Sequence, residues 1–479
     1  MNKLRRSLYT TGVLIIALFL FLSGWFGYTV YSQGSRWTVS QYNQRLTTAK
    51  KNTAMGDITD RYGVLLATTD AQGERRYNAD EALRRSVSQT VGDQLSMSGT
   101  GVESYHANLL TGFSGSVLDR MSAALTGKSY TGDNITLTID ANLCRYISEA
   151  FPVGYQGAVC VINYKTGEVL AMVSKPDYDP QALLESRVFD TEGSSYFNRC
   201  LQGQYTPGSI FKVITLASAL EHMPGIQQQQ FHCTASRAFG DTSVTCQSGA
   251  LAHGDLSLQG AFTRSCNCSF ATITCALGAE NLRATAEAFG FGERFSFADL
   301  TLYASNLTED LSDIGALAWT GVGQGETTVT PLHMAMTAGA IANGGMMMEP
   351  LLLLQAESAG GIPRLQAVAT EYRRVCSQET AATLTKYMYK TVESGTGTRA
   401  QIDDYAVCGK TGSAETSEDK SIETNAWFIG FLAEEEYPYA VSVVIEQGGA
   451  GGNRAASLAA STLKRAIALT DARAQQAQD

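Results

Sequence analysis

The chain has 479 residues and a formal net charge of −10, because its 46 aspartates and glutamates outnumber its 36 lysines and arginines. This length is enough for two or three domains with a large core. The acidic balance, without a basic stripe, argues against nucleic acid as a partner.

The first element in chain order is an apolar N-terminal helix. Residues 7–35 carry no charge and follow three basic residues. This pattern predicts a transmembrane helix, which needs roughly 20 residues, at residues 11–32 after a cytoplasmic tail of residues 1–10. A cleaved signal peptide is the alternative, which the bulky aromatic residues after the apolar centre disfavour. The basic N-terminus favours an inside orientation, with the remaining chain on the extracytoplasmic side of the cell membrane.

Residues 33–150 show the pattern of a strand-rich N-terminal domain. Ile135–Ile139 alternates as a strand does, and Asp140 is placed to cap a following helix. We find no acid/base or metal constellation in this segment. We therefore predict that it is a pedestal or dimerisation-like domain.

Residues 151–479 form the second predicted domain. Ala158–Ile162 and Val169–Val173 predict a hairpin whose turn contains Lys165. The later predicted elements are a largely helical middle over 209–390, strands over 405–414, 426–432 and 439–445, and a helix over 455–469. Short connections favour antiparallel neighbours. Strands at both sequence ends with helices between them predict an α+β sandwich, an antiparallel sheet flanked by helices.

Three short motifs in this domain carry chemistry. They are Ser209-Ile-Phe-Lys212, Ser265-Cys-Asn267 and Lys410-Thr-Gly412. Together they supply a serine nucleophile, a lysine beside it, a relay pair and a cationic anchor, which is typical of active-site serine acyl transferases. Each motif is weak alone, but the ordered set is specific.

Other matches to these motifs do not fit the order. Ser417 and Ser461 each begin a Ser-x-x-Lys after the other motifs, and Lys165 begins a Lys-Thr-Gly before them. Ser265-Cys-Asn267 is the only Ser-x-Asn. The order therefore leaves one assignment.

The residues around Ser209 support its role as a nucleophile. Pro207-Gly208 predicts a turn, and the apolar run after it predicts a buried helix. Ser209 would lie at the N-terminus of that helix, where free N–H groups favour negative charge. Lys212 would lie on the same face within reach of the hydroxyl. A capping serine followed by a surface lysine is the alternative, which the apolar surroundings disfavour.

Ten cysteines are many for an exported domain. Cys233 and Cys246 bracket a loop-like stretch and are candidates for a disulfide, which the sequence leaves open. Cys266 and Cys268 flank Asn267 too closely for easy bridging. Metal binding is conceivable, but no Cys-x-x-Cys or His-x-x-x-His spacing accompanies them. We therefore predict small buried thiols, no metal site and no cofactor.

These motifs and several further stretches resemble class B penicillin-binding proteins, the monofunctional peptidoglycan D,D-transpeptidases, and among them the short penicillin-binding protein A type. The further stretches are Gly56–Gly63, Leu137–Asp140, Thr166–Met172, Pro207–Ser209, Gly323–Gly325 and Trp427–Gly430. The sequence departs from the family at Met55, where Arg is usual, and at Ser413, where Thr is commoner. The resemblance implies a serine β-lactamase/transpeptidase-like sandwich over 151–479.

The resemblance implies a role for each motif residue. Ser209 would attack the penultimate carbonyl of a stem peptide ending in D-Ala-D-Ala, release D-alanine and form an acyl-enzyme. Lys212 would be the base, Ser265 would pass the proton to the leaving amine, and Asn267 would hold a substrate amide and Lys212. β-lactams would acylate the same serine.

The third motif would bind the donor. Lys410 and Thr411 would hold its terminal carboxylate, and Gly412 would let it lie along the strand edge. The backbone N–H groups of Ser209 and Ser413 would form the oxyanion hole. The implied partners are peptidoglycan stem peptides, β-lactams and a glycosyltransferase of the cell-wall machinery.

Two other functions remain open at this point. A D,D-carboxypeptidase differs only in accepting water. A non-catalytic β-lactam sensor or division scaffold would keep the fold without turnover, although sensors usually carry several membrane spans. A Ser-His-Asp hydrolase is disfavoured because none of the five histidines lies in a nucleophile-elbow context.

Overall fold

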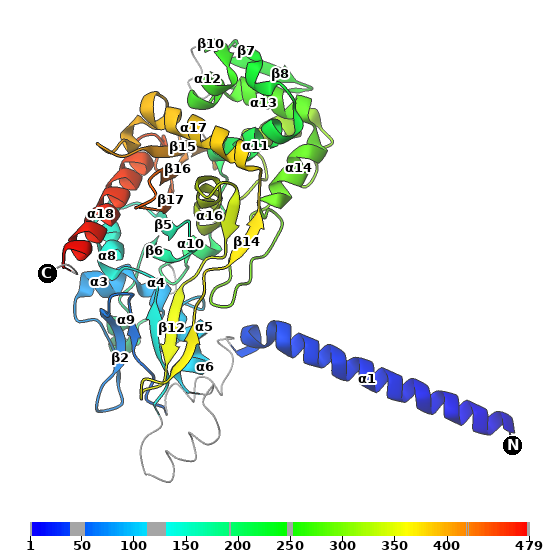
Figure 1. The fold of residues 1–479 in the computed structure, drawn as a ribbon, viewed down its shortest axis with the longest axis vertical. Coiled ribbons are helices and arrows are strands. Elements are labelled where there is room, and N and C mark those ends of the chain that lie inside the picture. Colours follow the sequence, from blue (N-terminus) through cyan, green and yellow to red (C-terminus); the bar gives the residue numbers. More distant parts are fainter. Residues whose placement is uncertain are drawn as a thin grey trace.

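A computed structural model describes residues 2–38, 53–112, 131–190, 193–246, 252–417, 419 and 421–476 (Figure 1). Lys420, which completes the Ser-x-x-Lys match at Ser417, lies outside the described residues.

Helix α1 (Asn2–Thr38) contains the apolar segment predicted from the sequence. Its stretch Tyr9–Thr29 is 21 residues long with a mean hydropathy of 1.9, and it is the only helix in the described ranges that is long and apolar enough to cross a membrane. None of this stretch is buried against the rest of the chain, and α1 extends away from the main body in Figure 1.

A six-stranded sheet lies at the end of the molecule where the N-terminal helices α3 to α6 gather (Figure 1). Its order is β13-β12-β4-β1-β2-β3. The strands are β1 (Ile58–Thr59), β2 (Leu65–Thr69), β3 (Arg75–Tyr77), β4 (Asn134–Leu137), β12 (Leu353–Glu357) and β13 (Pro363–Gln366). The helices are α3 (Glu81–Ser86), α4 (Ser88–Val91), α5 (Val102–Tyr105) and α6 (Ala107–Leu110). Because β12 pairs with β4, the sheet takes strands from both sides of residue 150.

The helix predicted after Asp140 is α8 (Ala141–Ala150). The Asp140 carboxylate accepts hydrogen bonds from the backbone N–H groups of Asn142 and Leu143, which caps the first turn. Helix α8 packs against α18 (Arg454–Gln476) at the C-terminal end of the chain.

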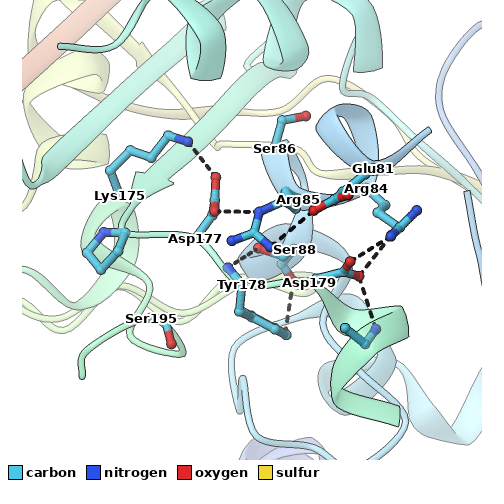
Figure 2. Close-up of polar contacts among 12 residues, drawn as sticks. Glu81, Arg84, Arg85, Ser86, Ser88, Lys175, Asp177, Tyr178, Asp179 and Ser195 are labelled. Atoms are coloured by element: carbon cyan, nitrogen blue, oxygen red, sulfur yellow. Dashed lines mark hydrogen bonds and ion pairs between the residues drawn. The ribbon is translucent and has the colours of Figure 1, made fainter. Parts of the chain in front are cut away.

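Charged side chains join the N-terminal helices to the segment after strand β6 (Figure 2). Arg84 on α3 donates two hydrogen bonds to the carboxylate of Asp179, at 2.8 and 2.6 Å. Asp177 accepts from Arg85 at 3.1 Å and from Lys175 at 2.5 Å. Each cation at this junction therefore has a carboxylate partner.

A five-stranded antiparallel sheet forms the centre of the second region, in the order β15-β16-β17-β5-β6. The strands are β5 (Gly157–Asn163), β6 (Val169–Lys175), β15 (Val407–Ala414), β16 (Asn425–Leu432) and β17 (Tyr439–Ile445). Helix α16 (Pro331–Ala342) packs on β5, β16 and β17, while α8 and α18 also pack on the sheet. Every residue of β16 and β17 is buried, so both faces of the sheet are covered. The predicted α+β sandwich is confirmed.

The middle of this region is helical, as predicted, but it also contains short strands. Its helices are α9 (Pro180–Ser186), α10 (Arg199–Gln202), η1 (Gly208–Phe211), α11 (Lys212–His222), α12 (Leu258–Thr263), α13 (Asn267–Leu277), α14 (Ala279–Ala288), α15 (Ile314–Gly321) and α17 (Gln378–Ser394). Its strands are β7 (Gln230–Cys233), β8 (Ser236–Phe239), β9 (Thr242–Thr245), β10 (Gly254–Ser257), β11 (Met346–Met348) and β14 (Glu371–Arg374). The stretch expected to be a loop between Cys233 and Cys246 is the β8–β9 hairpin. Its strands expose most of their residues, so they lack a strong alternating pattern.

Candidate active site

Ser209 lies in the 3₁₀ turn η1, immediately before helix α11. The helix itself begins at Lys212, one turn later than the sequence predicts. Gly208 has φ of +55°, and a Cβ there would lie 2.6 Å from the carbonyl oxygen of Ser413, so only glycine suits this position. The Gly208 N–H also donates to the carbonyl of Gly323 at 2.8 Å. The nucleophile turn is therefore held between strand β15 and the loop after α15.

Lys212 lies at the centre of the predicted constellation. Its Nζ is 3.0 Å from Ser209 Oγ. It is also 2.8 Å from the carbonyl oxygen of Ser265, 3.2 Å from Ser265 Oγ and 2.6 Å from Asn267 Oδ1. The structure thus brings the first two motifs together around one amine, which is fully buried.

Burial lowers the pKa of Lys212 from its ordinary range to about 8. The nearby thiols of Cys246, Cys266 and Cys268 act in the opposite direction. Within the described residues, the hydrogen bonds of this amine all go to neutral oxygens and none goes to a carboxylate. The protonated form of Lys212 therefore still predominates at pH 7, but the neutral amine is far more populated than in an ordinary lysine.

Ser265 lies in the turn between α12 and α13, and Asn267 is the first residue of α13. Ser265 has φ of +55°, a left-handed conformation that costs a residue with a side chain roughly 1–2 kcal/mol. The Asn267 amide is fixed at both ends, because its Nδ2 donates to the carbonyl of Thr245 at 2.7 Å while its Oδ1 faces Lys212. The strained turn aims a hydroxyl, a carbonyl and an amide oxygen at one amine.

Lys410 approaches the same hydroxyl from strand β15. Its Nζ donates to Ser265 Oγ at 3.0 Å and to the carbonyl of Thr411 at 3.0 Å. Burial and the charge of Lys212 together hold the pKa of Lys410 well below its usual range. Ser265 Oγ therefore lies within hydrogen-bonding distance of both lysine amines.

Aromatic rings line the buried lysines. Lys212 Nζ is 5.7 Å from the ring centre of Phe270, and Lys410 Nζ is 5.6 Å from that of Phe262. Both distances suit a cation–π contact. The sequence analysis did not identify these two phenylalanines, because helical spacing alone gives them the pattern of core residues.

The residues after Lys410 have distinct local contacts. A Cβ at Gly412 would lie 2.8 Å from the carbonyl of Pro207, so this glycine lets the nucleophile turn pack on the strand. The sequence analysis gave it a role at the strand edge instead. Thr411 Oγ1 is 2.6 Å from Thr396 Oγ1, and Ser413 Oγ accepts from the N–H of Gly451 at 3.1 Å. Thr396 was also missed, since it lies in no recognised motif.

Strand β15 is the first strand of the five-stranded sheet, and among the described strands it pairs only with β16. An unpaired strand edge can receive an extended chain, as a sheet edge does when it binds a peptide. The nucleophile turn η1 also packs against this strand. The geometry therefore combines a serine, an amine with a lowered pKa and a strand edge.

Comparisons with known proteins agree with this geometry. The family model described as the penicillin binding protein transpeptidase domain matches residues 157–466. The peptidoglycan D,D-transpeptidase PbpA of Mycolicibacterium smegmatis is 31% identical over 456 residues, covering 89% of this chain and 91% of the relative.

Two solved structures have the same fold over most of the chain. Penicillin-binding protein A from M. tuberculosis, as a ceftriaxone acyl-enzyme complex, has a TM-score of 0.79 at 29% identity and covers 87% of this chain and 99% of its own. The D,D-transpeptidase domain of a peptidoglycan glycosyltransferase from Eggerthella lenta has a TM-score of 0.76 at 29% identity, with coverages of 88% and 99%. The chain therefore belongs to the penicillin-binding protein transpeptidase family, as its motifs predict.

Proposed function

We propose that the chain is a peptidoglycan D,D-transpeptidase that works through an acyl-enzyme on Ser209 and is acylated by β-lactams at the same residue. The observation that carries this proposal is the 3.0 Å contact between Lys212 Nζ and Ser209 Oγ inside a buried site. A relative is named a peptidoglycan D,D-transpeptidase, and we infer from the family resemblance that the substrates are stem peptides that end in D-Ala-D-Ala.

The contacts of Lys212 explain how it can act as a base. A neutral amine has two N–H donors and one lone pair. The two shortest contacts, to Asn267 Oδ1 and the carbonyl of Ser265, use both donors. The lone pair then faces Ser209 Oγ and can accept its proton as the oxygen attacks the penultimate carbonyl.

The leaving group needs a proton, and Ser265 is placed to deliver it. Its hydroxyl lies 3.2 Å from Lys212 Nζ and 3.0 Å from Lys410 Nζ. The proton taken by Lys212 passes through Ser265 to the amine of the departing D-alanine, as the bond between that amine and the acyl carbon breaks. Ser209 keeps the acyl group as an ester.

Strand β15 positions the donor. Its terminal carboxylate would bind near Lys410, Thr411 and Ser413, and its negative charge would raise the pKa of Lys410 again. The N–H groups of Ser209 and Ser413 would stabilise the oxyanion, a role that is worth about 3 kcal/mol for each donor. The close approach of Gly208 to Ser413 supports this pairing.

The second half of the reaction distinguishes a transpeptidase from a carboxypeptidase. An amine of a second stem peptide attacks the ester and closes a cross-link, whereas water would give only a shortened peptide. We expect the full-length protein, supplied with nascent peptidoglycan, to form cross-linked dimers in addition to free D-alanine. Release of D-alanine without dimers would assign the carboxypeptidase function, and acylation without any release would assign a sensor.

We also propose the placement of the chain in the cell. Helix α1 supports a single-pass anchor in the cell membrane, with residues 151–479 as the transpeptidase domain on the extracytoplasmic side, where peptidoglycan lies. Residues 33–150 would serve as the pedestal that separates the site from the membrane. A glycosyltransferase that makes the glycan strands is the expected partner.

A further inference from the structure

Four potential metal ligands meet beside the second motif. They are Cys233 at the end of β7, Cys246 after β9, His253 before β10, and Cys266, the N-cap residue of α13. Their Sγ and Nδ1 or Nε2 atoms all lie within 4.8 Å of one another. The three cysteines are buried.

The distances within this cluster match a tetrahedral site. Metal–sulfur bonds of about 2.3 Å and metal–nitrogen bonds of about 2.0–2.1 Å give sulfur–sulfur edges of about 3.8 Å and sulfur–nitrogen edges of about 3.5 Å. Cys246 Sγ lies 3.7 Å from Cys233 Sγ and 3.8 Å from Cys266 Sγ. Cys233 Sγ lies 3.5 Å from His253 Nδ1. A disulfide would need about 2.0 Å, and the candidate pair Cys233 and Cys246 is not bonded.

We propose that Cys233, Cys246, His253 and Cys266 bind one Zn²⁺ ion. Three thiolates and an imidazole in tetrahedral array form a closed structural site of the kind that selects zinc. The sequence analysis predicted no metal because these residues come from separate elements and form no short spacing motif. The proposal does not depend on the proposed function.

The surroundings of Cys266 support ligation. Its Sγ accepts hydrogen bonds from Ser269 N at 3.5 Å and from Ser269 Oγ at 3.1 Å. Polar donors to a ligating sulfur stabilise its negative charge and fix its orientation. Both donors come from the first turn of α13, which holds the ligand on a rigid element.

The zinc would brace the segments that hold Lys212. Cys266 follows Ser265, whose carbonyl accepts from Lys212, and Cys246 follows Thr245, whose carbonyl accepts from Asn267. A bond from each cysteine to the same ion ties these two neighbouring segments together. The ion would thereby help to maintain the strained backbone of Ser265, making Cys266 a positioning residue.

Cys268 provides a matched control. Its Sγ is also near Cys246 Sγ, at 3.7 Å, but it donates to the carbonyl of Val244 at 3.6 Å and stands outside the group of four. It lies on the same turn as Cys266 and has the same chemistry. Cys268→Ser should therefore keep the metal, while Cys233→Ser and His253→Ala should lose it.

The test is the zinc content of the full-length protein, purified in detergent without chelator and measured by plasma mass spectrometry. We expect one zinc per chain in the wild type and in Cys268→Ser, and at least a fivefold loss in Cys233→Ser and His253→Ala. X-ray absorption at the zinc edge should show three sulfur ligands and one nitrogen ligand. This readout on the wild type holds even where a variant fails to fold.

Three results would overturn the proposal. Wild-type protein that contains no zinc and takes up none from added zinc salt would exclude the site. A mass two hydrogens lower, mapped to a bond between Cys233 and Cys246, would assign a disulfide instead. Zinc that persists in both ligand variants would place the ion elsewhere.

Discussion

The domain junction and the active site surround their cations with opposite kinds of partner. At the junction, Arg84 and Arg85 each face an aspartate, and Figure 2 shows these pairs pointing across the contact. In the active site, Lys212 and Lys410 donate only to neutral oxygens in the part of the chain that is described. Both lysines are fully buried.

This difference separates stability from reactivity. The junction arginines are charged in any surroundings, and their aspartate partners join the two segments. A buried cation without one has a lowered pKa and gives up its proton more easily, which costs folding free energy but prepares a base and an anion-binding group. The predictions below test this contrast, from the largest expected effect to the smallest.

The largest effect is expected from Ser209→Ala. Covalent labelling of this variant by fluorescent penicillin should fall by about 10³-fold or more, because the variant lacks the hydroxyl that forms the ester. Ser461→Ala is the control, since Ser461 also begins a Ser-x-x-Lys but its hydroxyl donates to the carbonyl of Leu458. Equal labelling of Ser209→Ala and the wild type would remove Ser209 from the mechanism.

Lys212→Met tests whether a buried lysine without a carboxylate partner lowers the stability of the fold as well as acting as a base. Acylation should fall by roughly 10²–10⁴-fold, the range of a lost general base. The folded-state pKa of about 8 lies below the unfolded value, so the stability contributed by the neutral form is lost as pH falls toward 8. At pH 7 the variant should therefore unfold at or above the wild-type temperature. A marked fall in the unfolding temperature would contradict the claim that Lys212 destabilises the folded protein at pH 7.

The wild-type pH profile gives a second view of Lys212. Only its neutral form can accept the proton of Ser209, so the acylation rate should rise as pH increases and level off above about 8. Stopped-flow acylation across this range provides the measurement. A rate that is flat from pH 6 to 9 would show that another group is the base.

Removal of the proposed zinc should have a smaller effect on the acylation rate. We expect a chelator to slow acylation by roughly 10–100-fold, which is the usual effect of losing contacts that orient catalytic groups. Added zinc should restore the rate, whereas added magnesium should not. Cys233→Ser, already without metal, should not respond to the chelator. An unchanged acylation rate in metal-free wild type would show that the zinc does not help to position Lys212.

The smallest effect on activity is expected at the junction. Arg84→Ala removes a bidentate partner of Asp179 and should destabilise the protein by about 1–3 kcal/mol, with the acylation rate within about twofold of the wild type. The matched control is Arg76→Ala, whose exposed pair with Asp70 should contribute much less to stability, because solvent and salt screen it. The measurement is the thermal unfolding temperature of both variants. Equal decreases in this temperature would show that the less exposed Arg84 pair contributes no more stability than the Arg76 pair.

The sequence predicted what depends on local chemistry and order. The strands around Lys410, the cap at Asp140 and the pairing of Lys212 with Ser209 all follow from short-range patterns. The ordered motifs predicted that distant segments meet, and hydrogen bonds connect residues of all three motifs in the structure.

Other features depend on tertiary contacts that no local pattern reports. Thr396 reaches Thr411 only through the packing of the chain after α17, and the role of Gly412 depends on how closely the nucleophile turn approaches β15. The thiol cluster is assembled from separate short strands with weak patterns. Strands β12 and β13 likewise join the six-stranded sheet by long-range pairing that the sequence order hides.

The most direct test of the account maps the penicillin adduct on the full-length protein by mass spectrometry after tryptic digestion. Cleavage after Arg199 and Lys212 gives the peptide Cys200–Lys212, in which Ser209 is the only serine. We predict a single adduct on this peptide. An adduct on the peptide Ser265–Arg283 instead, or no covalent adduct at all, would contradict the assignment of Ser209 as the nucleophile.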